Sequence, residues 1–141
     1  MIKKILFASD FTGITNRAEG YALSIAKSMG AEVTILHAVE PIADSTSDSA
    51  VEKFLDTKKR NAEAEAEKLA DEFRKEGVTA KVHVEIDKRW KSIVDTSKEG
   101  DFDLVILGSH KIHDGDKVYL GTTTHKVFFA ADLPLLVVPA E

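Results

Sequence analysis

The order of apolar segments along the chain is the feature that most constrains the fold. Short apolar runs of strand length alternate with segments whose apolar residues recur every three or four positions. A continuous or alternating run of this length predicts a strand, whereas the longer period predicts an amphipathic helix. Strands that alternate with helices indicate an α/β fold: a parallel sheet with right-handed crossovers and helices on both faces.

Five segments have the composition of strands. The first and the fourth are almost continuously apolar, which is typical of strands buried on both faces of a parallel sheet. The third alternates, so its apolar residues from Ala80 to Ile86 are expected on one face. The five predicted strands are Lys3–Asp10, Glu32–Val39, Thr79–Ile86, Phe102–Gly108 and Leu133–Ala140.

Four segments between the strands have helical spacing. We expect helices over Ile14–Met29, Val51–Phe73, a short segment from Trp90 to Gly100, and Gly121–Ala131. Trp90 is interpreted as a packing residue, and the charged face of the long second helix as solvated. The polar stretch 41–50 is expected to be a loop.

The ends and faces of two helices can be specified further. Thr12 or Thr15 is a candidate N-cap of the first helix, and Gly30 is expected to end it. The expected apolar face of the first helix comprises Ala18, Tyr21, Ala22, Ile25, Ala26 and Met29, and that of the fourth comprises Val127, Phe128 and Ala131.

Length and composition narrow the classes of function. A chain of 141 residues suits one domain, 1–141, and its net charge of −5 disfavours a nucleic-acid partner. The absence of cysteine excludes disulfides, thiolate metal sites and a cysteine nucleophile. The first apolar stretch is too short for a signal peptide, and no window approaches the roughly 18 apolar residues of a membrane span. We therefore expect a soluble, cytoplasmic protein with no membrane partner.

The carboxyl ends of the predicted strands form the expected binding edge. Open parallel sheets bind ligands at these ends, where the strand order reverses. The segments that reach this edge are Asp10–Gly13, Val39–Ala43, Asp87–Arg89 and Gly108–Gly121.

The stretch "LGSHKIHDGDKVYLGTTTHKV", from Leu107 to Val127, is too polar for a core. Three interpretations are open: a metal site, a solvated connection, or a loop beside the phosphates of a ligand. The candidate metal ligands are His110, His113, Asp114, Asp116 and His125. His37 and His83 alternate with apolar residues inside predicted strands and are interpreted as core or edge histidines.

Several residues of this stretch suit phosphate binding. We expect Gly108 to let the chain turn sharply off its strand and Gly121 to precede a helix, with Thr122 and Thr123 as caps. The amino terminus of that helix would attract phosphate. Lys111, Lys117 and His110 could add positive charge, and Asp10 could bind a ribose or Mg²⁺. G-x-G-x-x-G, the P-loop, H-E-x-x-H and G-x-S-x-G are absent from the sequence.

Four segments resemble the universal stress protein family: "KKILFASDFT", "AEVTILHAVEP", "FDLVILGSH" and "LPLLVVP". The resemblance covers nearly the whole chain. ATP-binding members of the family carry G-x-x-G, nine residues, and G-[ST]. Gly108, Gly121 and Thr122 match this pattern, whereas Lys111 stands in place of the second glycine. Phe11 follows Asp10 where the family more usually has glycine.

The resemblance implies a Rossmann-like, adenine nucleotide alpha hydrolase-like fold and ATP as ligand, with Mg²⁺. It implies that Asp10 and Val39 contact the ribose and adenine region. It also implies that the phosphates are contacted by Gly108, Gly121, Thr122 and Thr123. The candidate nucleotide-binding residues are Asp10, Thr12, Val39, Gly108, Ser109, Lys111, Gly121, Thr122 and Thr123.

The resemblance also implies a homodimer through the last strand. The run Leu135, Leu136, Val137 and Val138 independently favours a partner, because it would form an exposed apolar edge.

Three functions are compatible with these residues. The first is a stress or signalling protein that binds ATP. The second is a dimeric interaction module with a degenerate nucleotide site, in which Lys111 and Phe11 obstruct binding; Lys111 could instead supply an ammonium group to the phosphates. The third is a slow ATPase or phosphotransferase that uses His110 and Asp114.

Overall fold

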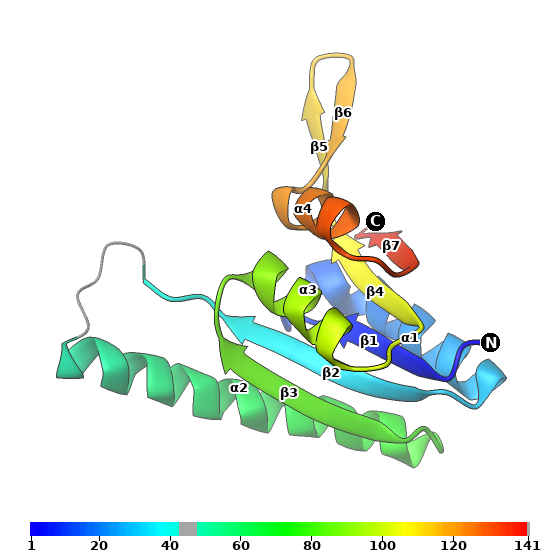
Figure 1. The fold of residues 1–141 in the computed structure, drawn as a ribbon, viewed down its shortest axis with the longest axis horizontal. Helices are drawn as coiled ribbons and strands as arrows, with labels where there is room; N and C mark the ends of the chain where they lie inside the picture. Colours follow the sequence, from blue (N-terminus) through cyan, green and yellow to red (C-terminus); the bar gives the residue numbers. More distant parts are fainter. Residues whose placement is uncertain (43–47, 141) are drawn as a thin grey trace.

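All five predicted strands form one parallel sheet in the computed structural model, which describes residues 1–42 and 48–140 (Figure 1). The strand order is β3-β2-β1-β4-β7, and every neighbouring pair is parallel. The strands are β1 (Lys4–Ala8), β2 (Glu32–Val39), β3 (Ala80–Ile86), β4 (Leu104–Ser109) and β7 (Leu135–Pro139).

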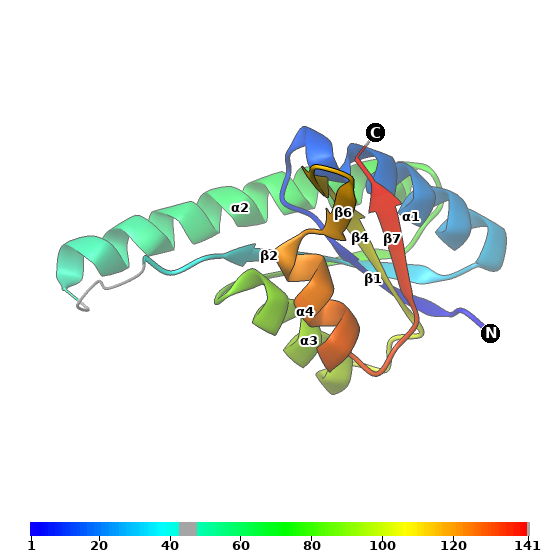
Figure 2. The same ribbon diagram turned by 90° about the horizontal axis from the view of Figure 1, so that it is seen from above.

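Helices cover both faces of this sheet. Figure 2 shows α1 (Asn16–Met29) and α2 (Ser49–Lys75) on one side, and α3 (Arg89–Glu99) and α4 (Thr122–Ala130) on the other. Alternate residues of the strands divide between two cores, as the pleat requires. Ile5, Phe7, Val33 and Ile35 belong to the core under α1 and α2, whereas Leu6, Leu36, Val105 and Leu107 belong to the core under α3 and α4. The predicted fold class is therefore confirmed.

The first helix buries a narrower face than the sequence predicted. Ala18, Ala22 and Ala26 are buried, but Tyr21 and Met29 are 47% and 52% exposed. Small side chains let the helix lie close to the sheet, so the flanking large residues remain outside the contact. The helix follows a 3-10 turn, η1 (Gly13–Thr15), and ends at Gly30 in the left-handed conformation. Thr12 caps η1, and Thr15 makes no capping bond to α1.

The long helix α2 begins earlier than predicted. The carboxylate of Asp48 accepts a hydrogen bond from the backbone N–H of Val51, so Ser49 and Ala50 belong to the helix and not to the expected loop. Residues 43–47 of that expected loop lie outside the described residues. The buried residues of α2 begin at Ala62, and the amino-terminal half extends beyond the sheet (Figure 1).

The fourth helix is one residue shorter at each end than predicted, and it buries less of the expected face. Val127 is buried as expected, but Phe128 is 60% exposed. The helix rests on its neighbours through Thr124 and Val127, which are three residues apart and share one face. Phe128 lies about 100° from Val127 around the helix axis, so it flanks this contact on the side of Thr124 away from Val127.

The polar stretch after β4 folds into a hairpin instead of a loop. Its strands, β5 (Lys111–Asp114) and β6 (Lys117–Leu120), are antiparallel and exposed throughout, and the hairpin projects from the sheet (Figure 1). Gly115 has φ +60°, as the first central residue of a type II′ turn does. The eight residues of β5 and β6 pair with each other and none of them is buried. Their sequence therefore lacks the apolar run or alternation that predicts a strand.

The strand order reverses between β1 and β4. The chain moves outward from β1 to β2 and β3, then crosses to the other side of β1 to form β4 and β7. The loops after β1 and β4 therefore diverge to opposite faces and leave a crevice at their carboxyl ends. In the described ranges, no helix has both the length and the apolar character needed to cross a membrane.

Candidate functional site

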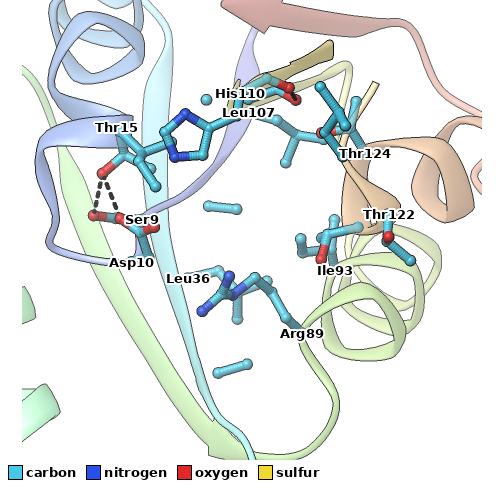
Figure 3. Close-up of a pocket in the computed structure, with 18 residues that line it drawn as sticks. Ser9, Asp10, Thr15, Leu36, Arg89, Ile93, Leu107, His110, Thr122 and Thr124 are labelled. Carbon is cyan, nitrogen blue, oxygen red and sulfur yellow. Dashed lines mark hydrogen bonds between the residues drawn. The ribbon is translucent and has the colours of Figure 1, made fainter. Parts of the chain in front are cut away.

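A cavity of about 250 Å³ lies at the carboxyl ends of β1 and β4 (Figure 3). Its lining comes from the ends of β1, β2 and β4, the start of α3, the hairpin and the first turn of α4. Apolar side chains such as Leu36, Ile93 and Leu107 share this lining with hydroxyls, one carboxylate and one guanidinium. The cavity therefore occupies the switch point that the topology creates.

Asp10 is held by the turn that follows β1. Its Oδ1 atom accepts hydrogen bonds from the backbone N–H of Thr12 (2.9 Å), the hydroxyl of Thr12 (2.6 Å) and the hydroxyl of Thr15 (3.1 Å). Partial burial raises the pKa of Asp10, but these bonds and the positive charge of Arg89 outweigh burial and lower the pKa below 3.8. Asp10 is therefore a carboxylate at neutral pH, with Oδ1 engaged within the chain.

Phe11 adopts a left-handed backbone conformation with φ 60°, which is unusual for a residue with a bulky side chain. Its N–H donates a hydrogen bond to Ser9 Oγ (3.1 Å), and its ring stacks on His37 with centroids 4.4 Å apart. This conformation directs Phe11 to the α2 side of the sheet. Phe11 is absent from the cavity lining, so its bulk does not fill the cavity.

His37 is a half-buried residue of β2, as the alternation of that strand predicted. Its Nδ1 atom lies 2.8 Å from the carbonyl oxygen of Ser9. A carbonyl accepts hydrogen bonds, so Nδ1 carries the proton and donates. Burial lowers the pKa of His37 below 6.5 and, together with the charge of Arg89, outweighs the opposing effects of Ser9 and Asp10. His83, by contrast, is exposed on the edge strand β3.

Arg89 is the residue that the sequence analysis did not single out. The segment Asp87–Arg89 was expected at the binding edge, but no motif distinguished its arginine. Arg89 begins α3 and lines the cavity, and its charge affects the pKa of both Asp10 and His37. No hydrogen bond or ion pair joins its side chain to another described residue. Among the described residues of the lining, Arg89 is the only permanent cation.

Gly108 has a packing role, and the expectation that it turns the chain off its strand is wrong. The strand β4 continues through Gly108 to Ser109. A Cβ atom at Gly108 would lie 2.6 Å from the carbonyl oxygen of Ile14 and 3.0 Å from Cα of Thr15. Such contacts are shorter than van der Waals separation, so glycine is required for η1 to pack against β4.

Gly121 is not required by the packing of the chain. It is the N-cap of α4 with φ −60° and ψ 154°, a conformation open to any residue, and the nearest atom to its Cβ position is Ser109 Oγ at 3.5 Å. Thr122 and Thr123, expected as caps, are instead the first two helical residues. The first intrahelical bond runs from His125 N–H to Gly121 O, so the N–H groups before it have no intrahelical partner.

Three of the predicted nucleotide-binding residues lie outside the cavity lining. Thr12 is exposed, and its hydroxyl donates a hydrogen bond to Asp10. Val39 is buried and lines a second hollow, which His37 also lines. Lys111 lines a third hollow together with His113. The other predicted residues do line the cavity: Asp10, Gly108, Ser109, Gly121, Thr122 and Thr123.

The metal-site interpretation has no support in the part of the chain that the structure describes. No group of three or more His, Cys, Asp or Glu side chains there could hold a metal ion. His113, Asp114 and Asp116 lie on the exposed hairpin, whereas His125 is on α4. His110 lines the cavity but Asp114 does not, so the proposed catalytic pair is not assembled.

Comparison with known proteins identifies the family. Residues 1–139 match the profile of the universal stress protein family. The chain belongs to this family. It is 26% identical over 147 residues to the universal stress protein YxiE of Bacillus subtilis (strain 168), which covers 98% of this chain and 99% of that protein.

Solved structures of universal stress proteins share the fold. The UspA protein of Lactobacillus plantarum superposes with a TM-score of 0.82 at 21% identity, covering 97% of each chain. A universal stress protein in complex with cAMP has a TM-score of 0.69 at 17% identity and covers 99% of each chain. One from Archaeoglobus fulgidus, in complex with dAMP, has a TM-score of 0.65 at 21% identity, covering 98% of this chain and 99% of that one.

The two glycines of this universal stress protein should respond differently to alanine. We expect Gly108→Ala to lower the free energy of unfolding by about 1–3 kcal/mol, because the added methyl overpacks the contact with η1. Gly121→Ala, the matched control, should change it by less than about 0.5 kcal/mol. Urea unfolding followed by circular dichroism measures both. Equal effects of the two substitutions would contradict the packing role of Gly108.

The stability of the protein should depend on the protonation of His37. Its pKa is lower in the folded state than 6.5, so the unfolded state gains its proton first and stability falls as the pH drops through 6.5. Asp10 acts in a separate range: its lowered pKa stabilises the folded protein, and this contribution is lost only as the pH falls below 3.8. Thermal unfolding about one unit above and below 6.5 should show a smaller decrease for His37→Asn than for the wild type. An identical decrease in both proteins would refute this assignment.

Proposed function

We propose that this universal stress protein binds an adenine nucleotide in the cavity and acts in stress response or signalling as a cytoplasmic homodimer. The observation that carries the proposal is the convergence of Asp10, Arg89 and the amino terminus of α4 on one partly apolar cavity. Family members with the same fold have been crystallised with cAMP and dAMP, which supports a nucleotide as the ligand.

Each part of a nucleotide has a chemical counterpart in the cavity. Leu36, Ala38 and Ile93 offer apolar surface to a base. Asp10 Oδ2 makes no hydrogen bond to the described residues and can accept one from a ribose hydroxyl. The first N–H groups of α4 carry a partial positive charge, so they suit a phosphate.

ATP with Mg²⁺ is the ligand that the family resemblance implied. Mg²⁺ is commonly held by one or two carboxylates together with waters and substrate phosphates. Asp10 is the only carboxylate among the described residues of the lining, and its Oδ1 is already engaged. We therefore propose that any Mg²⁺ arrives with the phosphates and gains at most one protein ligand.

The positions of Lys111 and Phe11 support nucleotide binding in this cavity. Both substitutions that suggested obstruction, Lys111 and Phe11, lie outside the cavity lining. An interaction module without nucleotide remains the alternative, and it predicts a folded protein that binds none.

Arg89→Gln should weaken nucleotide binding by about 10- to 100-fold. The reason is that a hydrogen bond from the Arg89 guanidinium to a charged phosphate contributes about 1.5–3 kcal/mol to the binding free energy. Lys88→Gln is the matched control: it removes the same charge one residue earlier, on a side chain outside the lining. Isothermal titration calorimetry with AMP, using folded protein, measures both affinities. Equal losses in the two variants would exclude a direct role for Arg89. No wild-type binding of AMP, cAMP, ADP or ATP at millimolar concentration would exclude the proposed function.

The dimer is proposed from the free edge of the sheet. The strand β7 is the last in the sheet order, and Leu135, Leu136 and Val137 are only partly buried. The N–H of Ala140 bonds Ser109 O in β4. Because strand residues alternate, the N–H groups of Leu136 and Val138 also face β4, whereas that of Val137 faces the free edge. A second copy could pair there in the antiparallel sense.

Val137→Pro should therefore yield a folded monomer, because proline removes the outward N–H without breaking a bond to β4. Val137→Ala keeps the N–H and should remain dimeric. Sedimentation velocity over a range of concentrations gives the oligomeric state, and circular dichroism confirms folding. A dimeric Val137→Pro variant, or a monomeric wild type, would refute the β7 interface.

A further inference from the structure

We infer that the cavity selects a nucleoside carrying a single phosphate, open or cyclic, over a nucleoside triphosphate. This inference rests on the proposed function, because it specifies which nucleotide the same site takes. Three features carry it: the size of the cavity, the side of the hairpin that faces it, and the balance of charge in its lining.

The cavity itself is small, and beyond Ile14 and His110 it adjoins the hollow that Lys111 and His113 line. Its volume of about 250 Å³ is below the roughly 300–1,000 Å³ of pockets that bury a drug-sized molecule. A base and ribose placed against Leu36, Ala38 and Asp10 would bring one phosphate to the first turn of α4. Further phosphates would have to continue past this turn, toward the hairpin.

The hairpin presents an apolar side chain to the cavity. Successive residues of a strand point to opposite faces. Ile112 lines the cavity, so Lys111 and His113 point to the other face, where they line the neighbouring hollow. The lysine that replaces the motif glycine is thus directed away from the cavity. Part of the backbone of Lys111–Leu120 is also occupied by β5·β6 pairing, so fewer of its N–H groups can bind phosphate.

The charge of the lining suits one phosphate better than three, because its sum is only about half a positive charge. Arg89 contributes one positive charge and the amino terminus of α4 roughly half of one, while Asp10 contributes one negative charge. A phosphate monoester carries about −1.5 to −2 at neutral pH, and a triphosphate carries more. The additional negative charge of ATP would meet Ile112 and no further permanent cation among the described residues of the lining.

The test compares ligands that differ only in phosphate. Isothermal titration calorimetry with AMP, cAMP, ADP and ATP, at one Mg²⁺ concentration, should show that AMP or cAMP binds at least about tenfold more tightly than ATP. Adenosine should bind more weakly than the better monophosphate. ATP binding as tight as both monophosphates would overturn the inference and leave the proposed function standing. If no nucleotide binds, the proposed function itself fails.

Three variants of the hairpin test whether Ile112 causes the preference for a monophosphate over ATP. Ile112→Ala should reduce the preference for monophosphate from about tenfold to about threefold or less, because it opens the path of the longer phosphate chain. Val118→Ala truncates an exposed side chain on the opposite face and should leave the preference unchanged, as should Lys111→Ala. A selective loss of ATP affinity in Lys111→Ala would show that the phosphates reach the neighbouring hollow, and would overturn the inference.

Discussion

The contact between Gly108 and the 3-10 turn η1 is the constraint on which the site depends. The turn packs so closely on β4 that a Cβ at Gly108 would lie 2.6 Å from the carbonyl oxygen of Ile14. Because Thr12 caps this turn, Thr15 ends it and both donate to Asp10 Oδ1, the same contact orients the carboxylate. Packing between β4 and η1 and the position of Asp10 are thus one structural feature.

The left-handed conformation of Phe11 is part of the same arrangement. The chain must leave β1, turn across its own end and enter η1 within a few residues. Phe11 makes this turn at φ 60°, which costs free energy in a residue with a side chain, and its stacking on His37 contributes an opposing gain. The bulky side chain consequently packs toward α2, and the cavity on the other side of Asp10 stays open.

The site combines residues whose positions were predictable with one whose role was not. Strand ends in a doubly wound sheet meet at one edge, so Asp10, Gly108 and Gly121 could be placed near each other from the sequence. The role of Arg89 could not be inferred in this way, because an arginine at the start of a short helix has no distinctive pattern. Its proximity to Asp10 results from the packing of α3 against β1, β2 and β4.

For the hairpin, the sequence predicted the position of the segment but not the direction of its side chains. The sequence places a polar segment between two glycines, and that segment does follow the carboxyl end of β4. Whether Lys111 faces a ligand depends on the register of β5 with β6, since a shift of one residue would exchange Lys111 and Ile112 between faces. Local pattern cannot determine this register, because every residue of both strands is exposed and no buried face selects it.

The sequence by itself determined the alternation of strands and helices, the parallel sheet and the edge at which a ligand would bind. It did so because burial on two faces imposes apolar runs, and amphipathic packing imposes a period near 3.6. Only the tertiary structure decided which side chains enter the cavity: Arg89 and Ile112 are included, whereas Thr12, Val39 and Lys111 are not. The physical reason is that side-chain direction depends on contacts between segments far apart in the chain, and one-residue changes in register or helix rotation alter it completely.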